Sequence, residues 1–150
     1  MHCLGLMSGT SADGVDAVLA RFEGTAQHPQ WSLLHHHHQP YPAELHKQVV
    51  SAGQGTPMPA CHWQDLAEAI TTVQAEAVQA CDPVGKAEVI GCHGQTVWHR
   101  PPADGRRGAS WQMLQAPLLA HLLQRPVIHD FRAADLALGG QGAPLVPRAD

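Results

Sequence analysis

The chain has 150 residues, which is enough for one compact domain with its own core but not for two large lobes. Hydrophobic residues make up 44% and charged residues 15%, a composition that excludes an intrinsically disordered chain. The formal net charge is -4 with no basic stripe, so we expect no binding to nucleic acid. No apolar run is long enough for a membrane span, and four scattered cysteines without a secretory leader predict reduced thiols in a cytoplasmic protein.

The first half of the sequence predicts three strands and two helices. Apolar runs at 2–7 and 15–22 flank the Gly- and Ser-rich stretch SGTSADG, which is typical of a β-hairpin. A third strand is expected at 31–38. Prolines followed by an apolar face predict a short helix at 40–52, and i, i+3, i+4, i+7 spacing predicts a long amphipathic helix at 59–80.

The second half predicts a strand at 87–92, a helix at 116–124 and a strand at 126–131. Three antiparallel strands followed by alternating helices and strands indicate an α/β fold. We expect a ribonuclease-H-like mixed sheet flanked by helices and covered on both faces.

Four consecutive histidines, His35 to His38, raise the question of a metal site. On a strand at most two of them share a face, and no cysteine or carboxylate nearby in the sequence completes a tetrahedral site. We therefore expect a polar strand end.

The stretch MSGTSADGVD has the composition of a ligand-binding turn. Gly9 and Gly14 permit close backbone approach and positive φ, and the hydroxyls of Ser8, Thr10 and Ser11 add donors. The turn could cradle phosphate oxygens, although it lacks the G-K-[ST] of a Walker loop. An ordinary Gly/Ser hairpin is the alternative.

A second polar cluster, His93, Gly94, Gln95 and Thr96, directly follows an apolar strand. Open α/β sheets hold small ligands at the ends of their strands, so this cluster predicts a binding edge. A solvated turn is the alternative.

The stretch HDFRAADLALGGQGAPLVP places Asp130 and Arg132 at the end of another strand. A carboxylate there could act as a general base, and a structural ion pair between Asp130 and Arg132 is the alternative. The glycine-rich loop after it could close over a ligand or simply turn.

In this order, GLMSGTSADGVDAVLARFEG, GCHGQTVWHRP and DFRAADLALGGQGAPLVP closely resemble the N-terminal half of anhydro-N-acetylmuramic acid kinases, and the likeness covers nearly the whole chain. The resemblance implies one lobe of the actin, Hsp70 and sugar kinase architecture, in which ATP lies between two ribonuclease-H-like lobes. These kinases use ATP and water to open 1,6-anhydro-N-acetylmuramic acid and phosphorylate its O6 in cell-wall recycling.

The resemblance also implies roles for single residues. Asp130 matches the catalytic base, which takes a proton from the water that attacks C1 while O6 accepts the γ-phosphoryl group. The resemblance implies a Mg²⁺ ion, for which Asp13 or Asp16 would be the protein ligand. It also implies a homodimer. The matching ATP phosphate-binding loop is Gly9, Thr10, Ser11, Ala12, Asp13, Gly14, Val15 and Asp16. The matching wall of the sugar cleft is His93, Gly94, Gln95, Thr96 and Arg132.

Two departures from the family pattern limit these expectations. Residues 110–117 read SWQMLQAP, where many relatives carry a glycine followed by an amide or acidic residue, and the chain stops at Asp150 without a second lobe. We therefore favour residues 1–150 as the N-terminal lobe of a truncated kinase that is inactive alone. The alternatives are a non-catalytic sugar- or nucleotide-binding half domain and a metal-binding, histidine-rich interaction protein.

Overall fold

The structure is a computed structural model that describes residues 1–25 and 27–143. Its strands are β1 (His2–Ser8), β2 (Gly14–Gly24), β3 (Pro29–Pro40), β4 (Val89–Arg100), β5 (Ala109–Met113) and β6 (Val127–His129). Its helices are α1 (Ala43–Gly53), α2 (Ala60–Cys81), α3 (Ala116–Leu123) and α4 (Ala133–Ala137). None of the described helices is both long and apolar enough to cross a membrane.

The strands form one six-stranded mixed sheet in the order β3-β2-β1-β4-β5, with β6 also paired to β4. β1 pairs with β2, and β2 with β3, in antiparallel hairpins. β4 runs parallel to β1 and to β6, because helices connect these strands and return the chain to the same end of the sheet. The predicted mixed α/β sheet is confirmed.

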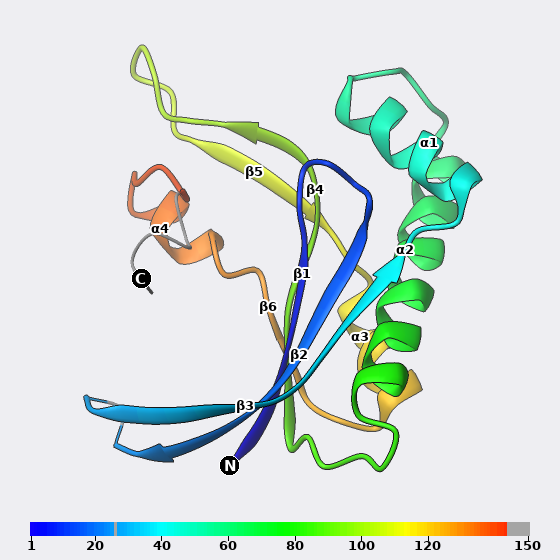
Figure 1. Ribbon diagram of the computed structural model, residues 1–150. Helices are drawn as coiled ribbons and strands as arrows, with labels where there is room; N and C mark the ends of the chain where they lie inside the picture. Colours follow the sequence, from blue (N-terminus) through cyan, green and yellow to red (C-terminus); the bar gives the residue numbers. More distant parts are fainter. Residues whose placement is uncertain (26, 144–150) are drawn as a thin grey trace.

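The core lies between the sheet and the three longer helices, which all cover the same face (Figure 1). Alternation along β1 turns Leu4 and Leu6 toward these helices, where they meet Ile70 of α2 and Leu119 of α3 in one buried cluster. Each such side chain contributes about 1.5–3 kcal/mol when fully buried. This packing holds the strand ends in fixed positions.

Two parts of the sheet differ from the sequence prediction. The polar residues after Cys92 do not end the strand: β4 continues to Arg100 and pairs with β5, which was not predicted. Gly94 has φ +77° and lies where the pairing register between β4 and β1 shifts. A β-bulge at this point lets the strand continue through residues 93–96. The short helix α4 was also not predicted.

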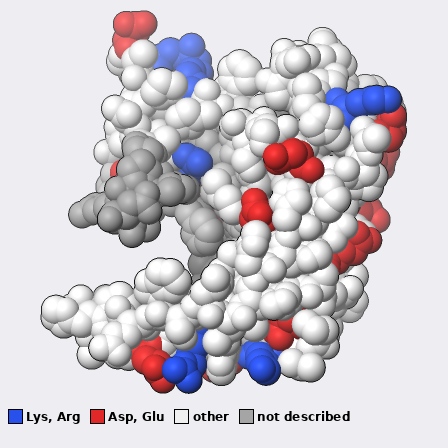
Figure 2. Space-filling model, in the orientation of Figure 1, with Lys and Arg blue, Asp and Glu red and all other residues white. Residues whose placement is uncertain are grey.

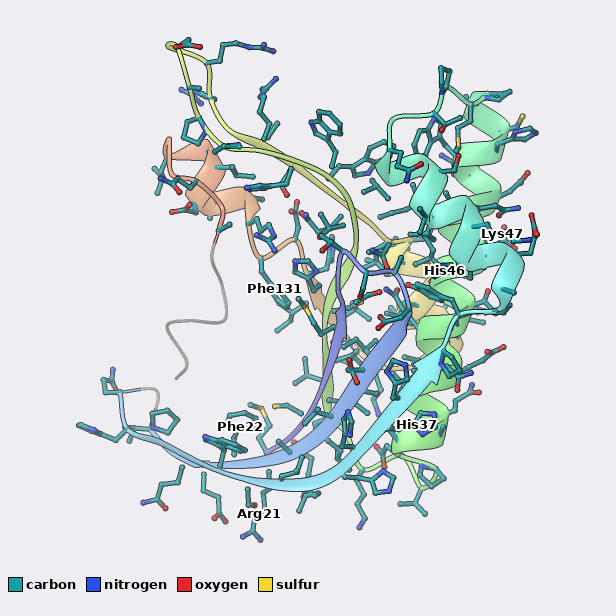
Figure 3. All side chains as sticks on the ribbon, turned by 45° about the horizontal axis from the view of Figure 1, so that its top comes forward. Arg21, Phe22, His37, His46, Lys47 and Phe131 are labelled. Atoms are coloured by element: carbon teal, nitrogen blue, oxygen red, sulfur yellow. The ribbon has the colours of Figure 1, made fainter. Side chains whose placement is uncertain are left out.

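Within residues 1–25 and 27–143, the face of the sheet opposite these helices is largely uncovered. Figure 2 shows a hollow there, whose inner surface over the β2–β3 hairpin carries no Lys, Arg, Asp or Glu. In Figure 3, Phe22 points to the hollow side of the hairpin and Arg21 to the other side, while Phe131 approaches the hollow from beyond β6. The expected cover of helices on both faces is therefore not present in the part of the chain that the structure describes.

Candidate functional site at the strand ends

The three segments that stood out in the sequence meet at one edge of the sheet. β1, β4 and β6 are parallel, and their register aligns Leu6 with Cys92 and Cys92 with His129. β1 and β6 end near this level and β4 continues past it, so the turn after β1, His93 of β4 and Asp130 after β6 lie at neighbouring positions of the sheet. This is the edge at which open α/β sheets bind ligands.

Three backbone carbonyl groups of the hairpin turn between β1 and β2 point into the protein. Their hydrogen-bond donors are Gln95 Nε2 for Gly9 (2.9 Å), His46 Nδ1 for Ala12 (2.7 Å) and the Tyr41 N–H for Asp13 (3.1 Å). Figure 3 shows His46 on α1 beside this turn. The turn is thus tied to β4, to α1 and to the end of β3.

The outward side of the same turn presents hydrogen-bond donors. Thr10, Ser11 and Asp13 are exposed, and within the described ranges their backbone N–H groups have no acceptor. A turn whose carbonyls are bound from inside and whose exposed residues keep unbonded N–H groups has the features of an anion-binding nest.

The left-handed residue of the turn is not the one expected. Ala12 has φ 54° and is almost fully buried, and its N–H closes the turn on the Gly9 carbonyl at 3.2 Å. Neither Gly9 nor Gly14 has a positive φ, so that part of the prediction is wrong. A Cβ at Gly14 would instead meet the Gln39 carbonyl oxygen and lie 2.9 Å from Pro40 Cα, so Gly14 allows β2 to pack closely against β3.

A groove of about 410 Å³ lies beside the turn. Thr10 and Ala12 of the turn form one side, Thr96 and Val97 of β4 another, and the C-terminal half of α1 the third. The size lies within the range of small-molecule sites. Two of the three predicted motifs therefore line one groove, whereas Asp130 and Arg132 do not line it.

Arg132 binds His93 rather than Asp130. Its Nε donates to His93 Nε2 at 3.1 Å and its Nη1 donates to the Gly142 carbonyl, while His93 Nδ1 donates to the Gly94 carbonyl at 2.9 Å. Burial lowers the pKa of His93 and the positive charge of Arg132 lowers it further, so the ring is neutral at pH 7.

The alternative of a structural ion pair between Asp130 and Arg132 is wrong, because no such pair exists within the described residues. Asp130 is exposed and adopts φ 58°, a conformation that is uncommon outside glycine. Its carbonyl accepts the Ala133 N–H at 3.1 Å, so the chain turns sharply after β6.

The two acidic residues of the hairpin differ in their partners. Asp13 Oδ1 accepts the Ser11 hydroxyl at 2.9 Å, whereas Asp16 Oδ1 lies 3.0 Å from His36 Nε2 and 3.2 Å from His38 Nδ1. Partial burial raises the pKa of Asp16, but the hydrogen bonds to the two histidines outweigh it and hold that pKa below its ordinary value.

The histidine run forms part of β3, as predicted for a polar strand end. Across residues 1–25 and 27–143, no group of three or more His, Cys, Asp or Glu side chains could hold a metal ion. The interpretation as a metal-binding protein gains no support from the structure.

Two supporting residues, Tyr41 and Asp135, carried no signal in the sequence. Tyr41 binds the buried Gln95 amide, and Asp135 accepts the Gly142 N–H at 2.7 Å and so shapes the glycine-rich loop. Ser8 was expected to offer its hydroxyl to a ligand, but it is buried beside Gln95 and Tyr41. Their partners are distant in the sequence, and only the fold brings them together.

Comparison with known proteins agrees with this arrangement of motifs. The family model described as anhydro-N-acetylmuramic acid kinase matches residues 1–150. The chain belongs to this family. The resemblance predicted from the three motifs is confirmed, and so is the fold class of a sugar kinase lobe.

Curated members of the anhydro-N-acetylmuramic acid kinase family align with the whole chain. The relatives named anhydro-N-acetylmuramic acid kinase from Synechococcus sp. (strain CC9605) and Synechococcus sp. (strain CC9902) are 82% and 71% identical over 150 residues. The relative of the same name from Parasynechococcus marenigrum (strain WH8102) is 68% identical over 150 residues. The chain spans 40% of the length of each of these relatives.

Proposed function

We propose that the chain is the N-terminal lobe of an ATP-dependent kinase that opens 1,6-anhydro-N-acetylmuramic acid and phosphorylates it to N-acetylmuramic acid 6-phosphate. The family membership supports the kinase class. The observation that carries the proposal is the hairpin turn at the ligand-binding edge of the sheet, whose carbonyls are bound inside the protein and whose exposed residues Thr10, Ser11 and Asp13 have no acceptor for their N–H groups within the described ranges.

The turn fits the phosphate groups of ATP. The N–H groups of Thr10, Ser11 and Asp13 would donate to phosphate oxygens, and the rest of the loop from Gly9 to Asp16 would hold them in place. Mg²⁺ keeps several waters and takes only one or two carboxylates beside phosphate oxygens, so Asp13 or Asp16 suffices as its protein ligand. When bound, the ion neutralises phosphate charge during transfer.

The sugar would lie against the middle of β4, beside the C-terminal ends of β1 and β6. His93, Gly94, Thr96 and Arg132 offer a neutral imidazole, a backbone segment, a hydroxyl and a guanidinium within one short stretch of this edge. No described carboxylate lies within ion-pair distance of Arg132, so its charge is available to an anionic group of the substrate. Gln95 has a different environment, described below.

Asp130 is proposed as the base. Its carboxylate is exposed, has no ion-pair partner in the described ranges and follows β6 at the ligand-binding edge. In this position it would take the proton of a water that attacks C1 of the anhydro sugar, while O6 leaves C1 and accepts the γ-phosphoryl group.

The chain spans 40% of the length of its relatives, and kinases of this architecture close two lobes around their substrates. We propose that residues 1–150 alone bind ligands but do not turn them over. In this respect the isolated chain would behave as the non-catalytic sugar- or nucleotide-binding half domain considered as an alternative. We also propose that the complete protein acts as a homodimer in the cytoplasm, where ATP is available.

A chimera tests this proposal. Residues 1–150 are joined to the remaining length of the Synechococcus sp. (strain CC9605) relative, which is 82% identical over the shared part. We expect the chimera to form ADP and the sugar 6-phosphate in equal amounts, and the 150-residue chain alone to form neither. The intact relative is assayed in parallel. If it is active while the chimera is folded but inactive, the proposal is contradicted.

A further inference from the structure

Gln95 is completely buried, although it belongs to the polar cluster of β4. Its Oε1 accepts a hydrogen bond from the Tyr41 hydroxyl at 3.2 Å and also lies within hydrogen-bond distance of the Ser8 hydroxyl, whose one proton is shared between Gln95 and the Gly14 carbonyl at 2.8 Å. Its Nε2 donates to the carbonyls of Gly9 at 2.9 Å and Thr96 at 3.1 Å. Both protons of the amide nitrogen are therefore used inside the protein, and two hydroxyl groups surround its oxygen.

The surroundings fix the orientation of this amide. Rotating it by 180° would place its oxygen against two carbonyl oxygens, those of Gly9 and Thr96, and both carbonyls would lose the donor that the amide supplies. The hydroxyls hold the other end in place. Burial raises the pKa of Tyr41 to about 12, so its hydroxyl keeps the proton that it donates.

The same Gly9 carbonyl also accepts the N–H of Ala12 at 3.2 Å, the bond that closes the hairpin turn. One carbonyl thus joins the closing bond of the turn to the amide of Gln95. Displacing this carbonyl would open the turn and rotate the peptide groups of Thr10 and Ser11.

We propose that Gln95 is a positioning residue for the phosphate-binding turn: its amide, oriented by Ser8 and Tyr41, holds the Gly9 carbonyl inside the protein so that the following N–H groups face the ligand. This inference rests on the proposed function, because it assumes that the turn binds ATP. It gives Gln95 an indirect role in place of the sugar contact expected from the sequence. It also joins the sugar edge to the nucleotide edge, since His93 and Thr96 lie on the same strand.

Replacing Gln95 by methionine tests the proposal, because Gln95→Met keeps the volume and removes the amide. The first readout is amide hydrogen exchange at Ala12 in the ligand-free 150-residue chain. We expect exchange at Ala12 to accelerate by about tenfold beyond any change in the slowest core amides, because the turn opens locally. The second readout is affinity for MgATP in the chimera, which we expect to fall by about tenfold or more.

Thr71→Val is the matched control. Thr71 is also completely buried and hydrogen-bonded, to the Ala67 carbonyl and the Gln115 N–H, but it lies on α2 away from the turn. We expect it to lower global stability while Ala12 exchange follows the core amides and the affinity for MgATP changes less than twofold. If Gln95→Met does not fold, Ser8→Ala, which removes one donor to the amide, should shift both readouts in the same direction.

The outcomes separate the two proposals. Unchanged Ala12 exchange in a folded Gln95→Met chain, or equal effects in Gln95→Met and Thr71→Val, would overturn the positioning role. If the unaltered chimera fails to bind MgATP, the proposed function fails, whereas the exchange measurement still decides whether Gln95 holds the turn.

Discussion

Asp130 is the residue on which the proposed chemistry depends. Asp130→Asn keeps the shape of the side chain and removes its basicity. In the chimera we expect kcat to fall by about 100-fold or more, with a much smaller change in sugar affinity. Steady-state kinetics with a separate binding titration measure both. Near-full turnover by the variant would remove Asp130 from the role of base and leave it a structural residue of the turn after β6.

His93 should make stability depend on pH. Burial and Arg132 lower its pKa in the folded chain, so the unfolded chain takes up the proton first as the pH falls. The free energy of unfolding should therefore be at its full value above about pH 6.5, the ordinary pKa of histidine, and should decrease below it. Urea unfolding of the 150-residue chain at pH 7, 6 and 5 measures this decrease.

His93→Asn is the control for that measurement, because asparagine does not titrate. We expect a smaller decrease between pH 7 and pH 5 in the variant, by up to ~1.4 kcal/mol per pH unit, which corresponds to one proton. The lowered pKa of Asp16 acts in a more acidic range, because a carboxyl group with a depressed pKa loses its contribution only as the pH falls below its ordinary value of about 3.9. Equal slopes in the two proteins would show that the burial of His93 has no energetic consequence.

At the scale of elements, the hairpin of β1 and β2 depends on its contact with β3. A valine at Gly14 would collide with the Gln39 carbonyl oxygen and crowd Pro40 Cα at 2.9 Å. We expect Gly14→Val to reduce the free energy of unfolding by at least ~2 kcal/mol, whatever it does to ATP binding.

Gly9→Ala is the matched variant, since among the described residues a Cβ there would meet only Ser11 Oγ, at 3.5 Å. Its stability should stay within ~0.5 kcal/mol of the original, as for most substitutions away from strained or packed positions. Urea titrations of both variants decide the matter. Equal stability of the two would contradict the role of Gly14 in packing β2 against β3.

The sequence predicted the hairpin well, because glycine and serine between two apolar runs are a local signal. It failed where contacts are distant: Ser8 meets Tyr41 and Gln95 at separations of 33 and 87 residues. It also failed at β4, because the polar residues after Cys92 are typical of a turn, and only pairing with β5 and the bulge at Gly94 keep them in a strand. The sequence therefore predicted which residues lie at the ligand-binding edge of the sheet. It did not predict which of them are exposed, such as Thr10, and which are buried and support the turn, such as Gln95.

At the scale of the whole molecule, the open face of the sheet should promote self-association. Trp31 is 66% exposed and Leu33 57% exposed on the β2–β3 hairpin, and the hollow side of that hairpin carries no charge (Figure 2). Exposed apolar patches of this kind mark interaction surfaces. We expect the 150-residue chain to form dimers or larger species with rising concentration, as measured by analytical ultracentrifugation.

Replacing both Trp31 and Leu33 by serine should weaken this association by about tenfold. Val84→Ser serves as control, because Val84 is 74% exposed but lies in the loop between α2 and β4. Equal association of all three proteins would show that the open face is not the contact surface.

The proposal that the turn after β1 binds the phosphates of ATP is tested most directly by an NMR titration of the ¹⁵N-labelled 150-residue chain with MgATP. We predict concentration-dependent shifts of the amide signals of Thr10, Ser11 and Asp13, which have no acceptor in the described structure. The core amides of α2 should not move. Shifts confined to other parts of the chain, or none at millimolar MgATP, would contradict the assignment of this turn as the phosphate-binding loop.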